Sequence, residues 1–280
     1  MIAPADILYR PRGRFASRSL GAHASSEVGG IWVFRDQAPF LRQPDARRID
    51  VRATLRDPLG GTYVRRFEQR SSIDVYVVMD LSASMGFVGS VDRFEVACHL
   101  SESLALSATR IGDRFGMIGA GGVAKRLFFG ATRARRVALE AVARLRSEGA
   151  LGASARGLAE CAAPLGATRK LVFLISDFRW PGEQIRNVFD AFALHDVAPL
   201  VLVDSIETSP PRWGLLELVD SETRGRRLLF MRPALRQQWI DAEETRRQQI
   251  AQIAVTSARA PIFIEDQVDA RAISQQLMAA

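Results

Sequence analysis

Three oxygen-bearing side chains at alternate positions, Asp80, Ser82 and Ser84, are the residues of this sequence best placed to do chemistry. They follow an apolar, β-branched run within residues 73–87, which predicts a buried strand over 75–79. A strand that ends there delivers one carboxylate and two hydroxyls into the loop beyond its carboxyl end. Mg²⁺ and similar cations prefer such hard oxygen ligands. The stretch therefore predicts a small cation-binding cluster.

A second carboxylate follows another predicted strand. Residues 170–175, Lys-Leu-Val-Phe-Leu-Ile, are typical of a central strand, and Ser176 and Asp177 come directly after it. Ligands of an open parallel sheet gather outside the carboxyl ends of its strands, so Asp177 meets Asp80 if the two strands are neighbours. The Asp-x-Ser-x-Ser pattern alone arises by chance in roughly one chain in ten of this length. Its position between a buried strand and a capped helix is what makes it informative.

From residue 73 onward, predicted strands alternate with predicted helices, which indicates an α/β fold with a mostly parallel sheet and helices on both faces. Asp92 and Glu95 form a capping-box-like start to a helix over 92–111, and Gly112 ends it. The remaining predicted elements are strands at 114–119, 123–128, 198–203 and 262–264, a hairpin within 213–230, and helices at 133–146, 154–163, 183–194, 233–255 and 270–278.

The first 72 residues have a different texture. Prolines, a glycine and arginines within 1–20 predict an irregular, partly ordered arm. Short extended pieces between turn residues within 21–72 predict a β-rich extension, with one strand at 31–34. Alternation over 48–55, a turn at 57–61 and a strand at 62–67 predict a hairpin with Ile49, Val51 and Ala53 on one face. We therefore divide the chain into an arm (1–20), an extension (21–72) and an α/β domain (73–280).

Composition limits the classes of protein to which the chain can belong. With 280 residues, 48% of them hydrophobic, it is long enough for one large domain or for one domain with an appendage. Because no segment has the apolar length of a signal peptide or membrane span, we expect a soluble, cytoplasmic protein. The two cysteines, Cys98 and Cys161, have no metal-ligand spacing, which argues against a disulfide framework and a zinc site.

The positive charge of the chain is almost wholly arginine. The formal net charge is +7, and Lys125 and Lys170 are the only lysines. The arginines are spread along the chain, as a codon bias would place them; an acidic partner is the alternative explanation, since arginine forms forked bonds to carboxylates and phosphates. Nucleic acid is compatible with the charge, but no nucleic-acid-binding motif occurs, and we do not expect such a partner.

The motif at 77–85, Val-Val-Met-Asp-Leu-Ser-Ala-Ser-Met, resembles the metal-ion-dependent adhesion site of a von Willebrand factor type A domain. Ser176–Asp177 resembles the second acidic position of that family. Upstream, the segments 21–25, 34–36, 45–50 and 62–68 are similar to bacterial proteins of the domain-of-unknown-function fifty-eight family, in which a β-rich lead-in precedes a von Willebrand type A domain. The resemblance covers nearly the whole chain, and it implies a Rossmann-like fold for residues 73–280.

The resemblance also implies a set of metal ligands. Ser82 and Ser84 would bind Mg²⁺ or another divalent cation directly, Asp80 and Asp177 would hold it largely through water, and one position would stay open for a carboxylate of a partner. A threonine normally completes such a site. Its position here corresponds to Gly152, and Ser154 substitutes for it only if the loop shifts.

The partners implied by the resemblance are a MoxR-type AAA+ ATPase and a client protein under assembly or activation. The chain would be a non-enzymatic adaptor between the two. A related branch of the family belongs to methanol-oxidation gene clusters, which implies a role in maturation of methanol dehydrogenase.

Three alternatives stay open. Asp80, Ser82 and Ser84 are also residue types that favour a simple helix-capping turn, and Asp177 is a common type of strand-end cap. A metal-dependent phosphatase would use Asp80 as its nucleophile, but such enzymes need a second aspartate where this chain has Ser82, and no nucleotide loop, zinc-protease or nucleophile-elbow motif occurs. A basic nucleic-acid-binding protein rests on charge alone.

Overall fold

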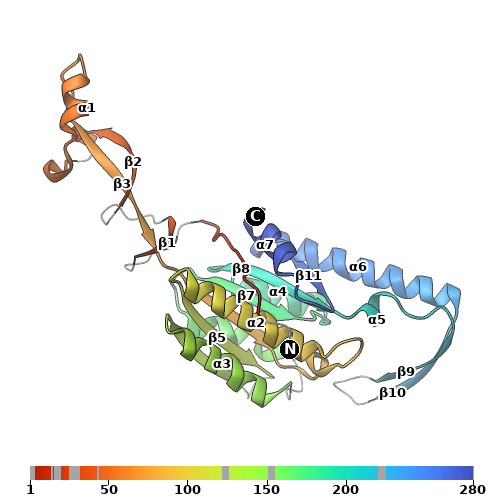
Figure 1. Cartoon of the computed structure of the whole chain (residues 1–280). Coiled ribbons are helices and arrows are strands. Elements are labelled where there is room, and N and C mark those ends of the chain that lie inside the picture. The colour runs from red at the N-terminus through yellow and green to blue at the C-terminus, as the bar shows by residue number, and fades with distance from the viewer. Residues whose placement is uncertain are drawn as a thin grey trace. The chain divides into compact units, whose positions relative to one another are not determined.

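The computed structural model describes residues 4–13, 15, 20–24, 32–42, 44–121, 126–150, 155–219 and 225–279. The chain forms two compact units (Figure 1). Unit 1 consists of Met1–Arg12 and Asp74–Ala280, and unit 2 consists of Gly13–Ile73.

Unit 1 is built around a six-stranded sheet with the strand order β11-β8-β7-β4-β5-β6. Its strands are β4 (Asp74–Asp80), β5 (Arg114–Ala120), β6 (Arg126–Thr132), β7 (Leu171–Ser176), β8 (Asp196–Val203) and β11 (Ile262–Glu265). All neighbouring pairs are parallel except β5 and β6. β4 and β7, whose residues are nearly all buried, lie side by side at the centre, as apolar runs of this kind predict.

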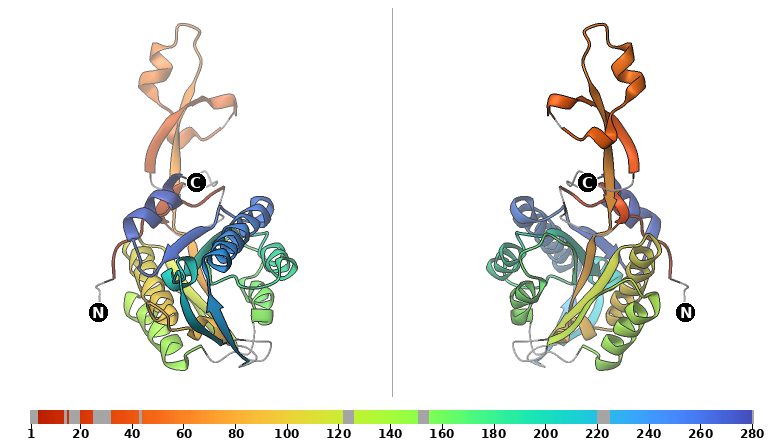
Figure 2. Two further views of the ribbon diagram at one scale, coloured as in Figure 1. Left: turned by 90° about the vertical axis from the view of Figure 1, so that its right-hand side faces the viewer. Right: turned by 90° about the vertical axis from the view of Figure 1, so that its left-hand side faces the viewer.

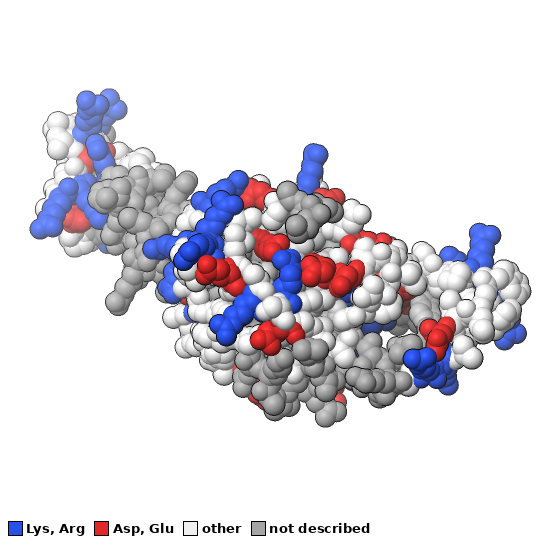
Figure 3. All heavy atoms as spheres, turned by 60° about the horizontal axis from the view of Figure 1, so that its bottom comes forward, with Lys and Arg blue, Asp and Glu red and all other residues white. Residues whose placement is uncertain are grey.

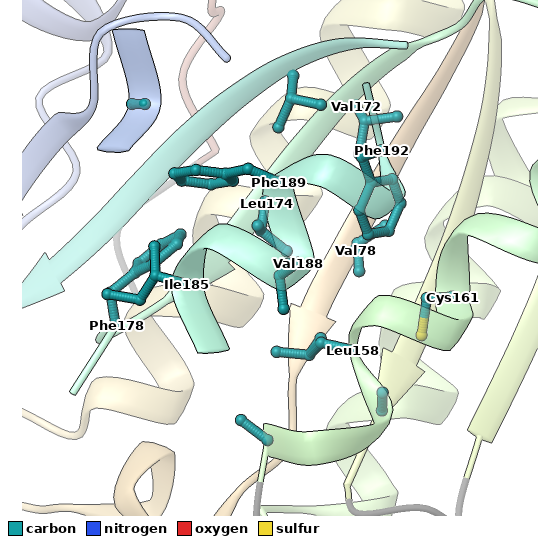
Figure 4. Close-up of a cluster of buried hydrophobic side chains, with 14 of the residues drawn as sticks. Val78, Leu158, Cys161, Val172, Leu174, Phe178, Ile185, Val188, Phe189 and Phe192 are labelled. Carbon is teal, nitrogen blue, oxygen red and sulfur yellow. The ribbon is translucent and has the colours of Figure 1, made fainter. Parts of the chain in front are cut away.

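Helices cover both faces of this sheet, which confirms the predicted α/β fold class. α2 (Arg93–Arg110), α3 (Arg135–Glu148) and α7 (Ala270–Ala279) lie on one face, and α4 (Gly182–Ala191) and α6 (Pro233–Ser257) lie on the other (Figure 2). The core under α4 and α6 is formed by aliphatic side chains of β4 and β7 and by the rings of Phe178, Phe189 and Phe192 (Figure 4). No helix in the described ranges has the length and apolar character needed to cross a membrane.

The ends of α2 follow from single residues that the sequence marks. The Asp92 carboxylate accepts a hydrogen bond from Glu95 N at 3.1 Å, which caps the first turn. Gly112, two residues after the last helical residue, has φ +87°, a conformation that favours glycine. The segment predicted as a helix over 154–163 is instead a pair of 3₁₀ helices, η4 (Ala155–Gly157) and η5 (Ala159–Leu165). Pro164 within η5 has no N–H to donate to an α-helical hydrogen bond, which accounts for part of the difference.

The described residues near the amino terminus form no helix or strand, yet they are fixed on unit 1. Ile7 N donates to Ser107 Oγ at 2.8 Å, and the Tyr9 hydroxyl donates to Asp113 at 2.8 Å. Arg12 N donates to Asp196, the same buried carboxylate that pairs with Arg259 at 2.6 Å. Part of the predicted arm is therefore packed against the α/β domain.

Unit 2 is a three-stranded antiparallel sheet with the order β1-β3-β2. Its strands are β1 (Leu20–Ala24), β2 (Trp32–Pro39) and β3 (Tyr63–Ser71). The prediction of a strand over 48–55 was wrong, because the helix α1 (Val51–Arg56) follows the 3₁₀ helices η1 (Phe40–Arg42) and η2 (Ala46–Arg48). Asp50 accepts hydrogen bonds from Arg52 N and Ala53 N, and this cap begins a helix where the alternation of apolar residues indicated a strand.

The excursion predicted within 213–230 is confirmed as a hairpin. β9 (Gly214–Val219) pairs antiparallel with β10 (Arg226–Met231) in a separate two-stranded sheet. It follows the short helix α5 (Ser205–Thr208), which begins directly after β8 and Asp204. The hairpin thus leaves unit 1 from the carboxyl end of the central sheet, where the candidate residues also lie.

Replacing Phe173 by alanine tests the importance of the central strands. The Phe173 side chain on β7 is fully buried, so we expect Phe173→Ala to lower the free energy of unfolding by about 3–5 kcal/mol. Leu194→Ala is the matched control, because Leu194 is 65% exposed and its loss should change stability by no more than about 0.5 kcal/mol. Urea denaturation measures both. Equal effects would show that β7 is not the centre of the core.

Candidate functional site

Asp80 and the loop that follows it lie at the carboxyl end of β4. Leu81 N donates to Ala120 O of the neighbouring strand at 2.8 Å, which fixes the start of the loop. Asp80 Oδ1 accepts from Ser82 N at 2.8 Å, and a 3₁₀ turn, η3 (Ala83–Gly86), follows. Part of the capping alternative is therefore correct, because Asp80 organises the turn. The serine hydroxyls, however, do not cap it.

The two serine hydroxyls face each other. Ser82 Oγ and Ser84 Oγ are 3.2 Å apart, and Ser82 stands at the N-cap position of η3 without making a side-chain capping bond. Ser82 is fully buried and Ser84 is partly exposed. The predicted pair of hydroxyls thus converges at one point at the edge of the sheet.

Asp177 is brought to the same edge because β4 and β7 are neighbours in parallel register, with Met79 opposite Ile175. Ser176 Oγ donates to Asp80 Oδ2 at 2.7 Å, which links the ends of the two strands directly. Asp177 is fully buried and accepts from Arg179 N at 3.2 Å. The structure therefore places Asp80, Ser82, Ser84 and Asp177 together, while Gly152 and Ser154 lie outside the described residues.

No cationic side chain in the described ranges pairs with Asp80. Burial, together with the charge of Asp177, raises the pKa of Asp80 to about 7, even though the hydrogen bonds from Ser176 and Ser82 act to lower it. Two buried carboxylates at one strand edge are costly unless positive charge offsets them. The donors around Asp80 are neutral, so a cation bound beside it would relieve this cost.

Arg93 supplies positive charge to Asp177. Its Nη1 donates to Asp177 Oδ2 at 2.9 Å and to Ser84 O at 3.0 Å, and its Nη2 donates to Glu207 Oε2 at 2.6 Å. The Arg93 side chain is 3% exposed, and its guanidinium carbon lies 5.0 Å from the centre of the Phe87 ring. The sequence did not indicate this contact. It marks Arg93 only as the first residue of a capped helix, and the carboxylates of Asp177 and Glu207 lie 84 and 114 positions away along the chain.

Arg93 belongs to an alternating set of charges across the carboxyl edge of the sheet, which we call the arginine–carboxylate chain. Arg179 pairs with Glu207 at 3.1 Å and with Glu243 at 3.3 Å, and Arg246 pairs with Glu243 at 2.6 Å. Its members are Arg93, Asp177, Glu207, Arg179, Glu243 and Arg246. Burial acts to raise the pKa of Glu243, but the bonds and charges of its arginine neighbours lower it below its usual value. The arginine–carboxylate chain thus connects α2 to α6 through the candidate site.

The donor set has the chemistry of a site for a hard divalent cation. Two serine hydroxyls lie 3.2 Å apart, that of Ser82 also interacts with Asp80, and the carboxylates of Asp80 and Asp177 lie at the same edge. No cluster in the described ranges, this one included, brings together three or more histidine, cysteine or acidic side chains suited to a metal, so the two serine hydroxyls are essential to the donor set. Arg93 already uses one oxygen of Asp177, so a cation would compete with its guanidinium for that carboxylate.

Three solved structures are similar to this chain at low sequence identity. The conserved hypothetical protein BatB from Bacteroides thetaiotaomicron is 16% identical with a TM-score of 0.44, over 74% of this chain and 97% of BatB. An aerotolerance-related membrane protein from Bacteroides fragilis is 17% identical with a TM-score of 0.43, over 74% and 98%. The SpRpn10 VWA domain is 12% identical with a TM-score of 0.38, over 74% and 94%. Curated proteins provide no match.

The pairing of Arg93 with Asp177 gives a measurable coupling. Because Arg93→Met leaves Asp177 buried without its cation, we expect a loss of about 3–5 kcal/mol in the free energy of unfolding. In the double variant with Asp177→Asn the loss should be smaller than the sum of the single losses by about 1–3 kcal/mol. Urea denaturation of the four proteins measures this. Additive losses would contradict a direct pair, and Arg144→Met on the exposed side of α3 is the control for arginine removal.

The sequence profile of the family described as "Protein of unknown function DUF58" matches residues 42–249, which spans both units and includes Asp80, Ser82, Ser84 and Asp177. The predicted family resemblance is thereby confirmed, and this chain belongs to the DUF58 family.

Proposed function

We propose that this chain is a non-enzymatic protein-interaction adaptor that binds a carboxylate of a partner at the carboxyl edge of its central sheet. The observation that carries the proposal is the convergence of Asp80, Ser82, Ser84 and Asp177 at the ends of two adjacent strands. Mg²⁺ or another divalent cation, held by the two hydroxyls and the two carboxylates, would supply the positive charge that a partner's carboxylate binds.

The environment of Asp80 speaks against the phosphatase alternative. Asp80 is fully buried, and each of its carboxylate oxygens accepts a hydrogen bond, one from Ser82 N and one from Ser176 Oγ. A nucleophile must reach its substrate, and the neighbouring position where such enzymes carry an aspartate is Ser82. These contacts suit a residue that organises a binding loop.

The hairpin that leaves the same end of unit 1 also favours a protein partner. Leu215 lies opposite Phe230 and Glu217 lies opposite Leu228, so these side chains share one face of the hairpin. The Trp213 ring contacts Phe230 edge-on, with the ring centres 6.3 Å apart. The apolar side chains Trp213, Leu215, Leu228 and Phe230 are each more than half exposed. Such an apolar surface is typical of protein contact sites.

On the family resemblance in its sequence, we propose a MoxR-type AAA+ ATPase as one partner and a client protein under assembly or activation as the other. Maturation of methanol dehydrogenase is one such client role. A nucleic-acid partner is not proposed, because the sequence contains no nucleic-acid-binding motif.

Removal of the serine hydroxyls tests the metal site. We expect 10 mM MgCl₂ to raise the melting temperature of the wild-type chain relative to EDTA, by an amount equivalent to about 2.7 kcal/mol if the Kd is one hundredth of that concentration. The rise should vanish in Ser82→Ala/Ser84→Ala and persist in Ser147→Ala, where the hydroxyl lies on the exposed side of α3 and bonds to Arg144 O. Differential scanning calorimetry provides the measurement. Equal shifts in all three proteins would place the cation elsewhere.

Recovery of partners tests the adaptor role. Pull-down with quantitative blotting is carried out with wild type and Asp80→Ala, each in Mg²⁺ and in EDTA. The wild-type chain in Mg²⁺ should retain the cognate MoxR-type ATPase and its client, and the other three conditions should lose most of both. Equal recovery in all four conditions would contradict binding through a metal ion. Hydrolysis of phosphoesters by wild type but not by Asp80→Ala would instead support the phosphatase alternative.

A further inference from the structure

We propose that the connection between β2 and β3 in unit 2, residues 40–62, is a second docking surface, and that it binds an acidic protein surface or segment that carries apolar side chains. This connection contains η1, η2 and α1 and lies at the end of the β2–β3 pair (Figure 1). It belongs to the other compact unit from the site at Asp80, and the proposal does not depend on a metal there.

The connection turns large apolar side chains into solvent. Leu41, Leu55 and Leu59 are 94%, 80% and 92% exposed, and Val51 is 62% exposed. Val51 and Leu55 are one turn apart on α1, so they lie on the same face of the helix. Single exposed apolar residues are ordinary, but four within one short connection indicate a contact surface.

These side chains are exposed on an ordered backbone. Phe40 N donates to Thr62 O at 2.7 Å, which closes the base of the connection, and Asp50 N donates to Tyr63 O at 2.8 Å. Tyr63 N donates to Thr54 Oγ1 at 3.0 Å, which fixes α1 on the start of β3. Because the backbone is held by these bonds, little ordering entropy would be lost when a partner covers the leucines.

Positive charge in the connection exceeds negative charge, with five arginines against three aspartates in residues 40–62. The described carboxylates of unit 2 are used internally, with Asp36, Asp45 and Asp50 paired to Arg66, Arg48 and Arg65 and with Asp57 accepting from Leu59 N and Gly61 N. Arg42, Arg47, Arg52 and Arg56 make no ion pair within the described ranges. Basic side chains also predominate over acidic ones on the face of unit 2 that Figure 3 shows.

Two of these arginines, Arg52 and Arg56, lie one turn apart on α1 and border a hollow of about 470 Å³. The rest of its lining is Gln37, Asp50, Ala53, Asp57, Tyr63 and Arg65. Asp57 accepts hydrogen bonds from Leu59 N and Gly61 N and makes no ion pair with either arginine among the described contacts. Asp50 is engaged by Arg65 at 2.9 Å and by Gln37 at 2.8 Å, so it does not neutralise Arg52 or Arg56. The hollow therefore offers two free guanidiniums to a carboxylate, the anion that arginine binds in a forked geometry.

The combination of exposed leucines and arginines indicates which class of partner binds this surface. Residues 13–73 contain 11 arginines, no lysine and six acidic residues, so an acidic partner is favoured electrostatically. A nucleic acid would use the arginines but leave the leucines in water, since phosphate contacts supply its affinity. An acidic protein segment with apolar side chains uses both.

A random 12-residue peptide library, displayed on phage and selected on the immobilised full-length chain, tests this proposal. Selection is repeated on Arg52→Glu/Arg56→Glu, on Leu55→Ser/Leu59→Ser, and on the control Arg135→Glu/Arg144→Glu, which changes the charge equally on the exposed side of α3. Circular dichroism melting shows that each variant is folded. Affinities of the enriched peptides and of a 20-base-pair DNA duplex are then measured by fluorescence polarisation.

We expect enrichment of peptides that combine Asp or Glu with Leu or aromatic residues. Their affinity should fall at least tenfold for Arg52→Glu/Arg56→Glu and at least threefold for Leu55→Ser/Leu59→Ser, and stay within twofold for the control. No enrichment, or enrichment of peptides without acidic residues, would overturn the proposal. Tighter binding of the duplex than of any peptide would also overturn it, as would affinities that the leucine variant leaves unchanged.

Discussion

The parallel pairing of β4 with β7 is the constraint on which the candidate site depends. Because the register sets Met79 opposite Ile175, the residues that follow each strand arrive together, and both carry buried carboxylates. Carboxylates without water need hydrogen bonds and positive charge. Asp177 receives Arg93, whereas Asp80 receives one N–H and one hydroxyl. Only one of the two carboxylates is thus paired with a positive charge among the described contacts. A cation bound at this edge would be stabilised most by the other one, Asp80.

The arginine–carboxylate chain extends this constraint over the whole edge of the sheet. Each arginine contacts two carboxylates or one carboxylate and a carbonyl, so the loops after β4, β7 and β8 are tied to α2 and α6. Because the charges of this network are paired with one another, removal of one member would leave another without its partner. The effect of the network here is to keep the binding loops in one geometry while α5 and the hairpin project from the same end.

Local patterns predicted most of the fold. The β-branched runs before Asp80 and Asp177 indicated central strands, and Asp92 with Gly112 marked the limits of α2, because these signals act over a few residues. The strand expected at 48–55 failed because a single carboxylate, Asp50, caps α1 and overrides the alternation of apolar side chains.

The convergence of the two carboxylates could be anticipated from strand ends, but the order of the strands could not. Arg93 was missed for a related reason, since its partners come from loops more than 80 residues away and no local spacing encodes such a contact. The exposed leucines of residues 40–62 were likewise invisible, because a leucine reads as a core residue until its neighbours are known.

The double engagement of Arg93 bears on whether a metal and this arginine can share the site. Nη1 bonds to Asp177, while Nη2 bonds to Glu207 at 2.6 Å. A cation that drew Asp177 away from Nη1 would leave the guanidinium paired with Glu207 and stacked near Phe87. The exchange would therefore break one contact without stranding a buried charge.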